Sequence, residues 1–193
     1  MANYLTGVRR ERTALLEWNG HGAIEAMARF CRTKVCGPEG ACFQKSRKAE
    51  ARTAGNGKTA GDGLPCPDAR ILEVDYYGRA GARALAGCLN GGYRRIIVDY
   101  GEITDTGMYE CARCDLKIVV GALSEWQAGA FLELMQREPV RDRSWIYAAA
   151  FGSGEARREW EKAFGRPCIR IPASVDAFAV TRADMEFFRT LLF

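Results

Sequence analysis

The chain has 193 residues, enough for a sizeable core, and its 48% hydrophobic content excludes a disordered protein. The formal net charge is +4, and the basic residues cluster only at Lys45 to Arg52. We interpret this cluster as a solvated loop, so the net charge does not indicate nucleic-acid binding. No apolar run has the length of an integral membrane segment, and the first residues lack a signal-peptide pattern, so we predict a cytoplasmic protein.

The N-terminal part predicts one strand, one turn and one helix. Residues 13–19 form an apolar run that ends in polar residues, and glycines on both sides of His21 indicate a turn. An amphipathic helix is predicted over residues 23–31. Residues 32–68 form an irregular insertion, rich in glycine and cysteine, within a single α/β domain that covers residues 1–193.

From residue 69 onward, strand and helix patterns alternate. Strands are predicted at residues 70–76, 95–99, 116–123, 144–151 and 168–171. Helices are predicted at residues 81–89, 124–137, 153–164 and 181–193, and residues 105–114 form a loop or a short helix. Ser124, Ser153 and Thr181 are the predicted N-caps. This order predicts a three-layer α/β/α fold with a mostly parallel sheet.

Two predicted strands end in a carboxylate. Asp99 follows Ile96-Ile97-Val98 and precedes Gly101, while Glu17 ends the first strand and precedes Asn19. Ligands of parallel sheets bind at the carboxyl ends of the strands. Asp99 can therefore serve a bound Mg²⁺ or cap the next turn, and the sequence leaves both interpretations open. The same alternative applies to Glu17.

The order of these motifs resembles the MinD/ParA family of P-loop ATPases, including its CpaE/TadZ-type relatives. The motifs that carry the resemblance are Ala2 to Leu5, Thr13 to Glu17, Ile96 to Asp99, Asp115 to Val120, Ser124 to Leu134, and Ile171-Pro172. The resemblance implies a P-loop NTPase-like fold with ATP and Mg²⁺ as cofactors. Asp99, Glu17, Asn19 and Gly101 would then lie at the nucleotide, with Asp99 at the Mg²⁺.

The family's first strand and phosphate loop have no counterpart in the sequence and would lie before Met1. Gly55 to Thr59 does not replace the loop, because Arg52 stands where the pattern needs glycine. Since the family's first strand is central in its sheet, we expect two strand edges to remain unpaired.

Two functions follow from this gap. One is a non-hydrolysing scaffold or regulator that acts through protein contacts, with a partner protein or a second copy, in positioning or in secretion and pilus assembly. The other is a genuine ATPase whose phosphate loop is absent from this chain.

The eight cysteines support a third hypothesis, a zinc-binding module. Cys111 and Cys114 form a CxxC that precedes a strand, which argues against redox chemistry. Further ligands could come from Cys31, Cys36, Cys42 and Cys66, but buried or idle thiols are the favoured interpretation. Trp126, Phe131, Leu132 and Met135 are expected mainly in the core, with an interface anchor as the alternative for Trp126.

Overall fold

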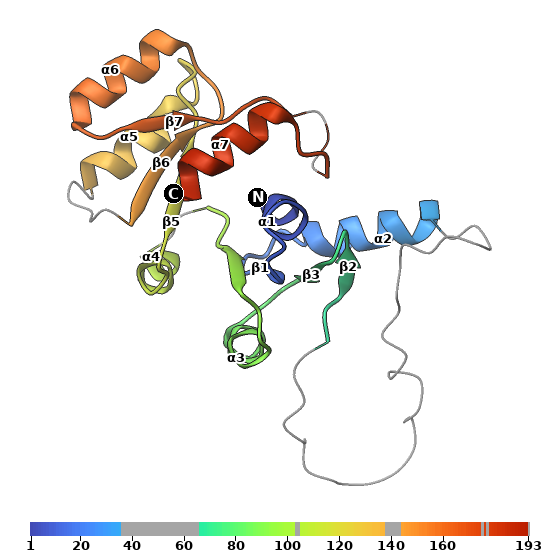
Figure 1. Ribbon diagram of the computed structural model, residues 1–193. Helices are drawn as coiled ribbons and strands as arrows, with labels where there is room; N and C mark the ends of the chain where they lie inside the picture. The colour runs from blue at the N-terminus through green and yellow to red at the C-terminus, as the bar shows by residue number, and fades with distance from the viewer. Residues whose placement is uncertain (36–65, 103–104, 138–143, 175, 177, 193) are drawn as a thin grey trace, which may run out of the picture. The chain divides into compact units, whose positions relative to one another are not determined.

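The computed structural model describes residues 1–35, 66–102, 105–137, 144–174, 176 and 178–192. The chain divides into two compact units, residues 1–103 and 104–193, whose labelled elements can be followed in Figure 1. Each unit has a sheet of its own, so we describe them separately.

Unit 1 contains a 4-stranded sheet in the order β2-β3-β1-β4. Its elements are α1 (Ala2–Gly7), β1 (Thr13–Glu17), α2 (Ala23–Val35), β2 (Ala69–Ile71), β3 (Val74–Tyr77), α3 (Ala82–Asn90) and β4 (Arg95–Asp99). β1 runs parallel to both β3 and β4, and only β2 is antiparallel to its neighbour. The central position of β1 explains its apolar sequence, because a strand with neighbours on both sides and helices on both faces is buried throughout.

The two faces of this sheet bury different side chains. Ala14 and Leu16 face one core cluster with Tyr77 and Cys88, and Leu85 of α3 packs against it. Leu15 lies on the opposite face, against a cluster that includes Ala2 of α1 and residues of α2. The alternation along β1 therefore places helices on both faces of the sheet, as the sequence predicted.

The predicted strand 70–76 is wrong in detail, because these residues form a hairpin instead. β2 and β3 pair antiparallel, with Ile71 opposite Val74. The two turn residues, Leu72 and Glu73, both have positive φ, at 48° and 64°. Asparagine and glycine are the usual residues in such a turn, so Leu72-Glu73 gave no turn signal in the sequence.

Unit 2 contains a 3-stranded parallel sheet in the order β5-β6-β7. Its elements are α4 (Asp105–Ala112), β5 (Lys117–Gly121), α5 (Ala128–Arg137), β6 (Trp145–Ala149), α6 (Gly154–Phe164), β7 (Cys168–Arg170) and α7 (Arg182–Leu192). Its core joins Val119 of β5 and Tyr147 of β6 to Phe131 and Met135 of α5 and Trp160 of α6. The expectation that Phe131 and Met135 are core residues is thus confirmed, and Leu132 packs against the same cluster.

Helix ends follow the predicted caps at two of three places. Ser153 accepts a hydrogen bond from the backbone N–H of Ala156 at 3.0 Å, and Gly165 ends α6 in the left-handed conformation. Thr181 precedes α7, where its hydroxyl accepts from the N–H of Asp184 at 3.2 Å and the Asp184 carboxylate accepts from the N–H of Thr181 at 2.8 Å. These reciprocal bonds have the pattern of a capping box.

The predicted helix start at Ser124 is wrong. α5 begins at Ala128, and Ser124 donates its hydroxyl hydrogen bond to the Gln127 side chain instead of capping a backbone N–H. Trp126 therefore lies in the turn before the helix, where it is 85% exposed. The expectation that Trp126 is a core residue is corrected by this exposure.

β4 and β5 each end a sheet, so in the part of the chain that the structure describes each has one open edge. The mixed α/β class with mostly parallel strands is confirmed. No helix among the described residues is both long and apolar enough to cross a membrane.

Candidate functional site

The four residues predicted from the strand ends do come together in unit 1. β1 and β4 pair in a register that places Glu17 beside Asp99, so both strands end at the same edge of the sheet. Asn19 follows β1 and donates from Nδ2 to the main-chain oxygen of Asp99 at 3.2 Å. Gly101 donates its N–H to Asp99 Oδ1 at 2.9 Å. The strand ends pointed to Glu17 and Asp99, and the family resemblance added Asn19 and Gly101 to the group.

Glu17 is a buried carboxylate, with 1% of its surface exposed. Its Oε1 accepts from the N–H of Ala23 at 2.6 Å, and its Oε2 accepts from the N–H of Ile24 at 3.4 Å. These are free amides at the start of α2, where the helix dipole favours a negative charge. Both oxygens of Glu17 are therefore engaged in joining α2 to β1.

Asp99, in contrast, is exposed at the end of β4. Its Oδ1 accepts from Gly101, whereas no described residue is within hydrogen-bonding distance of Oδ2. Gly101 has a φ of 66°, and a Cβ there would lie 3.0 Å from Asn19 Cβ, so glycine suits this turn. The turn thus orients Asp99 and leaves one carboxylate oxygen available.

The Asn19 side chain is engaged at both ends. Its Oδ1 accepts from the N–H of His21 at 3.0 Å while its Nδ2 reaches the backbone of Asp99. His21 lies in the predicted turn and is exposed. Asn19 therefore ties the loop after β1 to the end of β4.

Among the carboxylate oxygens of these residues, only Asp99 Oδ2 accepts no hydrogen bond from the described residues. Mg²⁺ prefers six oxygen ligands and is usually held by one or two carboxylates together with phosphates. Because Glu17 is buried with both oxygens turned to the start of α2, the set does not form a magnesium site by itself. Among the described residues, no group of three or more histidine, cysteine, aspartate or glutamate side chains is arranged to hold a metal ion.

A second cluster of polar side chains was missed by the sequence analysis. Asp75 lies in the middle of β3 and is 1% exposed. It accepts from Arg70 Nε at 2.6 Å, from Arg70 Nη2 at 2.7 Å and from the Tyr93 hydroxyl at 2.6 Å. Tyr93 also lies 3.0 Å from the Tyr77 hydroxyl, and Arg12 stacks on its ring. A carboxylate inside the apolar run Val74 to Tyr77 was the signal available.

Burial alone would raise the pKa of Asp75, but hydrogen bonds from Arg70 and Tyr93 hold it below the usual value. Burial raises the pKa of Tyr77 and of the neighbouring Cys88 thiol, so both stay protonated at neutral pH. With every polar group partnered, this cluster stabilises the interior of unit 1 and offers no reactive group.

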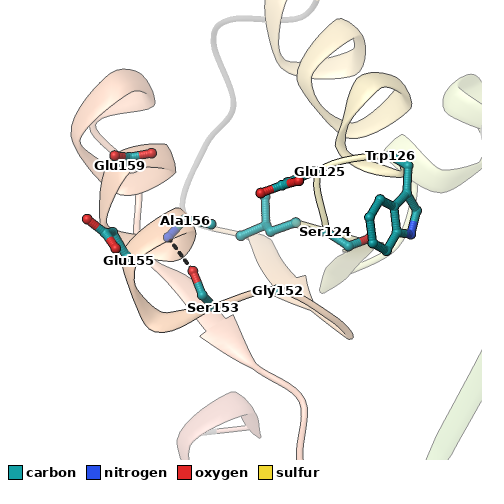
Figure 2. Close-up of a pocket in the computed structure, with 9 residues that line it drawn as sticks. Ser124, Glu125, Trp126, Gly152, Ser153, Glu155, Ala156 and Glu159 are labelled. Carbon is teal, nitrogen blue, oxygen red and sulfur yellow. Dashed lines mark hydrogen bonds between the residues drawn. The ribbon is translucent and has the colours of Figure 1, made fainter.

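Unit 2 has a cavity of about 460 Å³ beyond the ends of β5 and β6. Figure 2 shows Glu125 from the turn before α5 on one side, and Glu155 and Glu159 of α6 on the other. Among the described residues, none of these carboxylates makes an ion pair. Negative charge from three glutamates repels phosphates, so this cavity does not suit a nucleotide's phosphate groups.

The described cysteines show no metal-site arrangement. Cys111 in the last turn of α4 and Cys114 just after it are half-buried and form no disulfide, and burial raises the pKa of Cys111. Cys168 is buried in the core of unit 2, where burial raises its pKa to about 11. A raised pKa disfavours the thiolate form that binds zinc or reacts with disulfides.

Some of the residues that the sequence singled out lie outside the described part of the chain. These are the basic cluster Lys45 to Arg52, the glycine-rich Gly55 to Thr59, and two of the possible zinc ligands, Cys36 and Cys42. A third possible ligand, Cys31, lies in α2, but its side chain is not among those described.

No family model matches the chain, and no curated protein matches it. Among solved structures, the chain is similar to the ParA family ATPase from Chlorobium tepidum TLS, with 15% sequence identity and a TM-score of 0.47. The match covers 99% of this chain and 91% of that chain. The α/β class of this chain is assigned from its own strands and helices, described above.

Proposed function

We propose that the chain is a MinD/ParA-like scaffold that acts through protein contacts and does not hydrolyse ATP. The observation that carries the proposal is the use of the strand-end residues. Glu17 caps α2 with both oxygens, and Asn19 links two loops, so these side chains serve the fold. The order of the sequence motifs supports the family.

The open edge of β4 supports the contact role. Ile96, Ile97 and Val98 are only half-buried there, although such apolar strands are normally covered in parallel sheets. An apolar edge strand with free backbone groups is a template for another chain. The CpaE/TadZ-type resemblance implies that such contacts serve positioning or the assembly of a secretion system or pilus.

Measurement of ATP turnover by the purified chain with Mg²⁺ tests this proposal. We expect no Mg²⁺-dependent hydrolysis above the buffer rate, with Asp99→Ala indistinguishable from the unchanged chain. Glu102→Ala serves as the matched control, because Glu102 is also an exposed carboxylate and lies three residues from Asp99. Turnover that Asp99→Ala abolishes and Glu102→Ala preserves would contradict the scaffold role.

The second candidate is a Mg²⁺-nucleotide site at Asp99, as in a genuine ATPase. It is favoured by one observation, the exposed Asp99 carboxylate, whose Oδ2 accepts no hydrogen bond from a described residue. Such a site needs a phosphate-binding loop, and no segment of residues 1–193 matches that pattern. Calorimetric titration with ATP, with and without Mg²⁺, distinguishes the two candidates. Only an Asp99 site predicts Mg²⁺-dependent binding that Asp99→Asn removes.

A further inference from the structure

The outer edge of β4 offers a defined set of backbone groups. Arg95 N–H donates to the Arg12 oxygen at 3.2 Å, and the Asp99 oxygen accepts from Trp18 N–H at 2.8 Å, so alternate residues from 95 to 99 face β1. The N–H and C=O groups of Ile96 and Val98 must then point outward. Among the described residues, none of these four groups has a hydrogen-bond partner.

The sequence of β4 is complementary to itself when reversed. An antiparallel second copy centred on Ile97 places Arg95 opposite Asp99 of the second copy, and Ile96 opposite Val98. In this register the outward groups of Ile96 and Val98 meet as hydrogen-bonded pairs. Arg95 and Asp99 then occupy positions without backbone hydrogen bonds, where side chains of opposite strands lie closest. Backbone pairing and charge pairing therefore require the same register.

Both charged side chains have capacity for such a contact. The Arg95 side chain is 47% exposed and uses Nε for Glu11 at 2.6 Å, while a guanidinium has further N–H donors. Asp99 is exposed, and its Oδ2 accepts no hydrogen bond from the part of the chain that the structure describes. Ile97, half-buried on the face shared with Leu15, would meet Ile97 of the second copy at the twofold axis.

We infer that two copies of this chain pair through the open edges of their β4 strands, antiparallel and centred on Ile97. The open edge of β5 lacks this property, because reversing β5 places Lys117 opposite Gly121, which carries no charge. The inference rests on the proposed function, because it identifies a second copy of the chain as one partner for the proposed protein contacts. It needs no nucleotide.

Analytical ultracentrifugation of charge variants tests the pairing. We expect a concentration-dependent dimer with twice the chain mass of 21.4 kDa. Asp99→Arg and Arg95→Asp each place like charges in register, which should weaken dimerisation at least about tenfold. An equimolar mixture of the two variants restores opposite charges at both positions and should recover the dimer. A monomer at all concentrations, or single variants that dimerise normally, would overturn the inference.

Backbone variants keep the test decisive if Arg95→Asp fails to fold after losing Glu11 as a partner. Val98→Pro removes an outward N–H and no hydrogen bond to β1, and proline is tolerated in edge strands. Val98→Ala keeps that N–H while shortening the same side chain. We expect Val98→Ala to dimerise and Val98→Pro to remain monomeric with an unchanged far-UV spectrum. Equal dimerisation of both would refute the β4 edge. These assays contain no ATP. A monomeric result would therefore contradict the β4 pairing alone, whereas Mg²⁺-dependent ATP turnover would contradict the scaffold role.

Discussion

Asp75 shows how one buried carboxylate depends on its neighbours. Hydrogen bonds from Arg70 and Tyr93 outweigh burial and lower its pKa. A carboxyl group with a folded-state pKa below its unfolded value stabilises the fold above the unfolded value, about 4, and this contribution is lost as pH falls through the folded value. The stability of unit 1 should therefore decline on acidification below that point.

We expect Asp75→Asn to lower the free energy of unfolding by about 2 kcal/mol at pH 7, since hydrogen bonds to a charged group are lost. The variant should also lose less stability than the unchanged chain when the pH is lowered below about 4. Urea denaturation at several pH values measures both effects. Parallel pH profiles for the two proteins would show that Asp75 does not carry the acid sensitivity.

The sequence pattern predicted where the candidate site lies, but it did not predict the hydrogen-bond partners of the side chains in that site. The ends of the apolar strands pointed to Glu17 and Asp99, because parallel strands end at one sheet edge, and the family resemblance added Asn19 and Gly101. That Glu17 caps α2 depends on a tertiary contact that spacing does not specify. Asp75 escaped notice because its partner Tyr93 is 18 residues away.

At the scale of elements, the serine before each predicted helix has a different role. The Ser153 hydroxyl caps α6 by accepting from a backbone N–H, whereas the Ser124 hydroxyl donates to the Gln127 side chain. Ser153→Ala should therefore lower the free energy of unfolding by about 1 kcal/mol, and Ser124→Ala by less than about 0.5 kcal/mol. Thermal denaturation of the two variants compares them directly. An equal loss would mean that the Ser153 hydrogen bond adds no helix stability.

In the hairpin turn between β2 and β3, the backbone conformation is unfavourable for the residues that occupy it. Leu72 and Glu73 hold positive φ angles that asparagine and glycine adopt more easily, and Leu72 is exposed. The double substitution Leu72→Asn and Glu73→Gly should raise the free energy of unfolding by about 1 kcal/mol. Glu73→Ala, which keeps the strained geometry, should give no gain. Chemical denaturation measures both, and a gain in the alanine control would point to another cause.

The same turn explains why element boundaries were less predictable than element types. The hydrophobic pattern of residues 70–76 is that of a strand, and no glycine or asparagine marks the reversal. Likewise, Ser124 with Gln127 three residues later has the sequence of a capped helix start, yet α5 begins at Ala128. In both places tertiary structure overrode a local signal.

For the whole molecule, pairing through β4 would couple stability to concentration. Because a partner that binds only the folded chain raises Tm by mass action, a tenfold increase in protein concentration should raise Tm by about 2 °C. Asp99→Arg, whose dimerisation is weakened, should show a smaller rise of Tm over the same concentration range. Scanning calorimetry over a concentration series makes the comparison. A concentration-independent Tm for the unchanged chain would contradict a folded-state dimer.

Strand order was predictable at this scale only in part. The alternation of strands and helices predicted parallel pairing, which holds for all strand pairs described except β2 with β3. The division of the strands between two sheets was not evident from the pattern, because hydrogen-bonded neighbours are chosen by packing over long sequence separations.

The contrasting environments of two tryptophans give the molecule optical reporters of its own. Trp126 is 85% exposed, whereas Trp160 is 3% exposed and stacks on Phe131 at 5.1 Å between ring centroids. Aqueous iodide should quench the emission of Trp126 and leave that of Trp160 untouched until the core of unit 2 opens. Fluorescence of Trp126→Phe and Trp160→Phe variants would then separate events at the surface of unit 2 from the loss of its core.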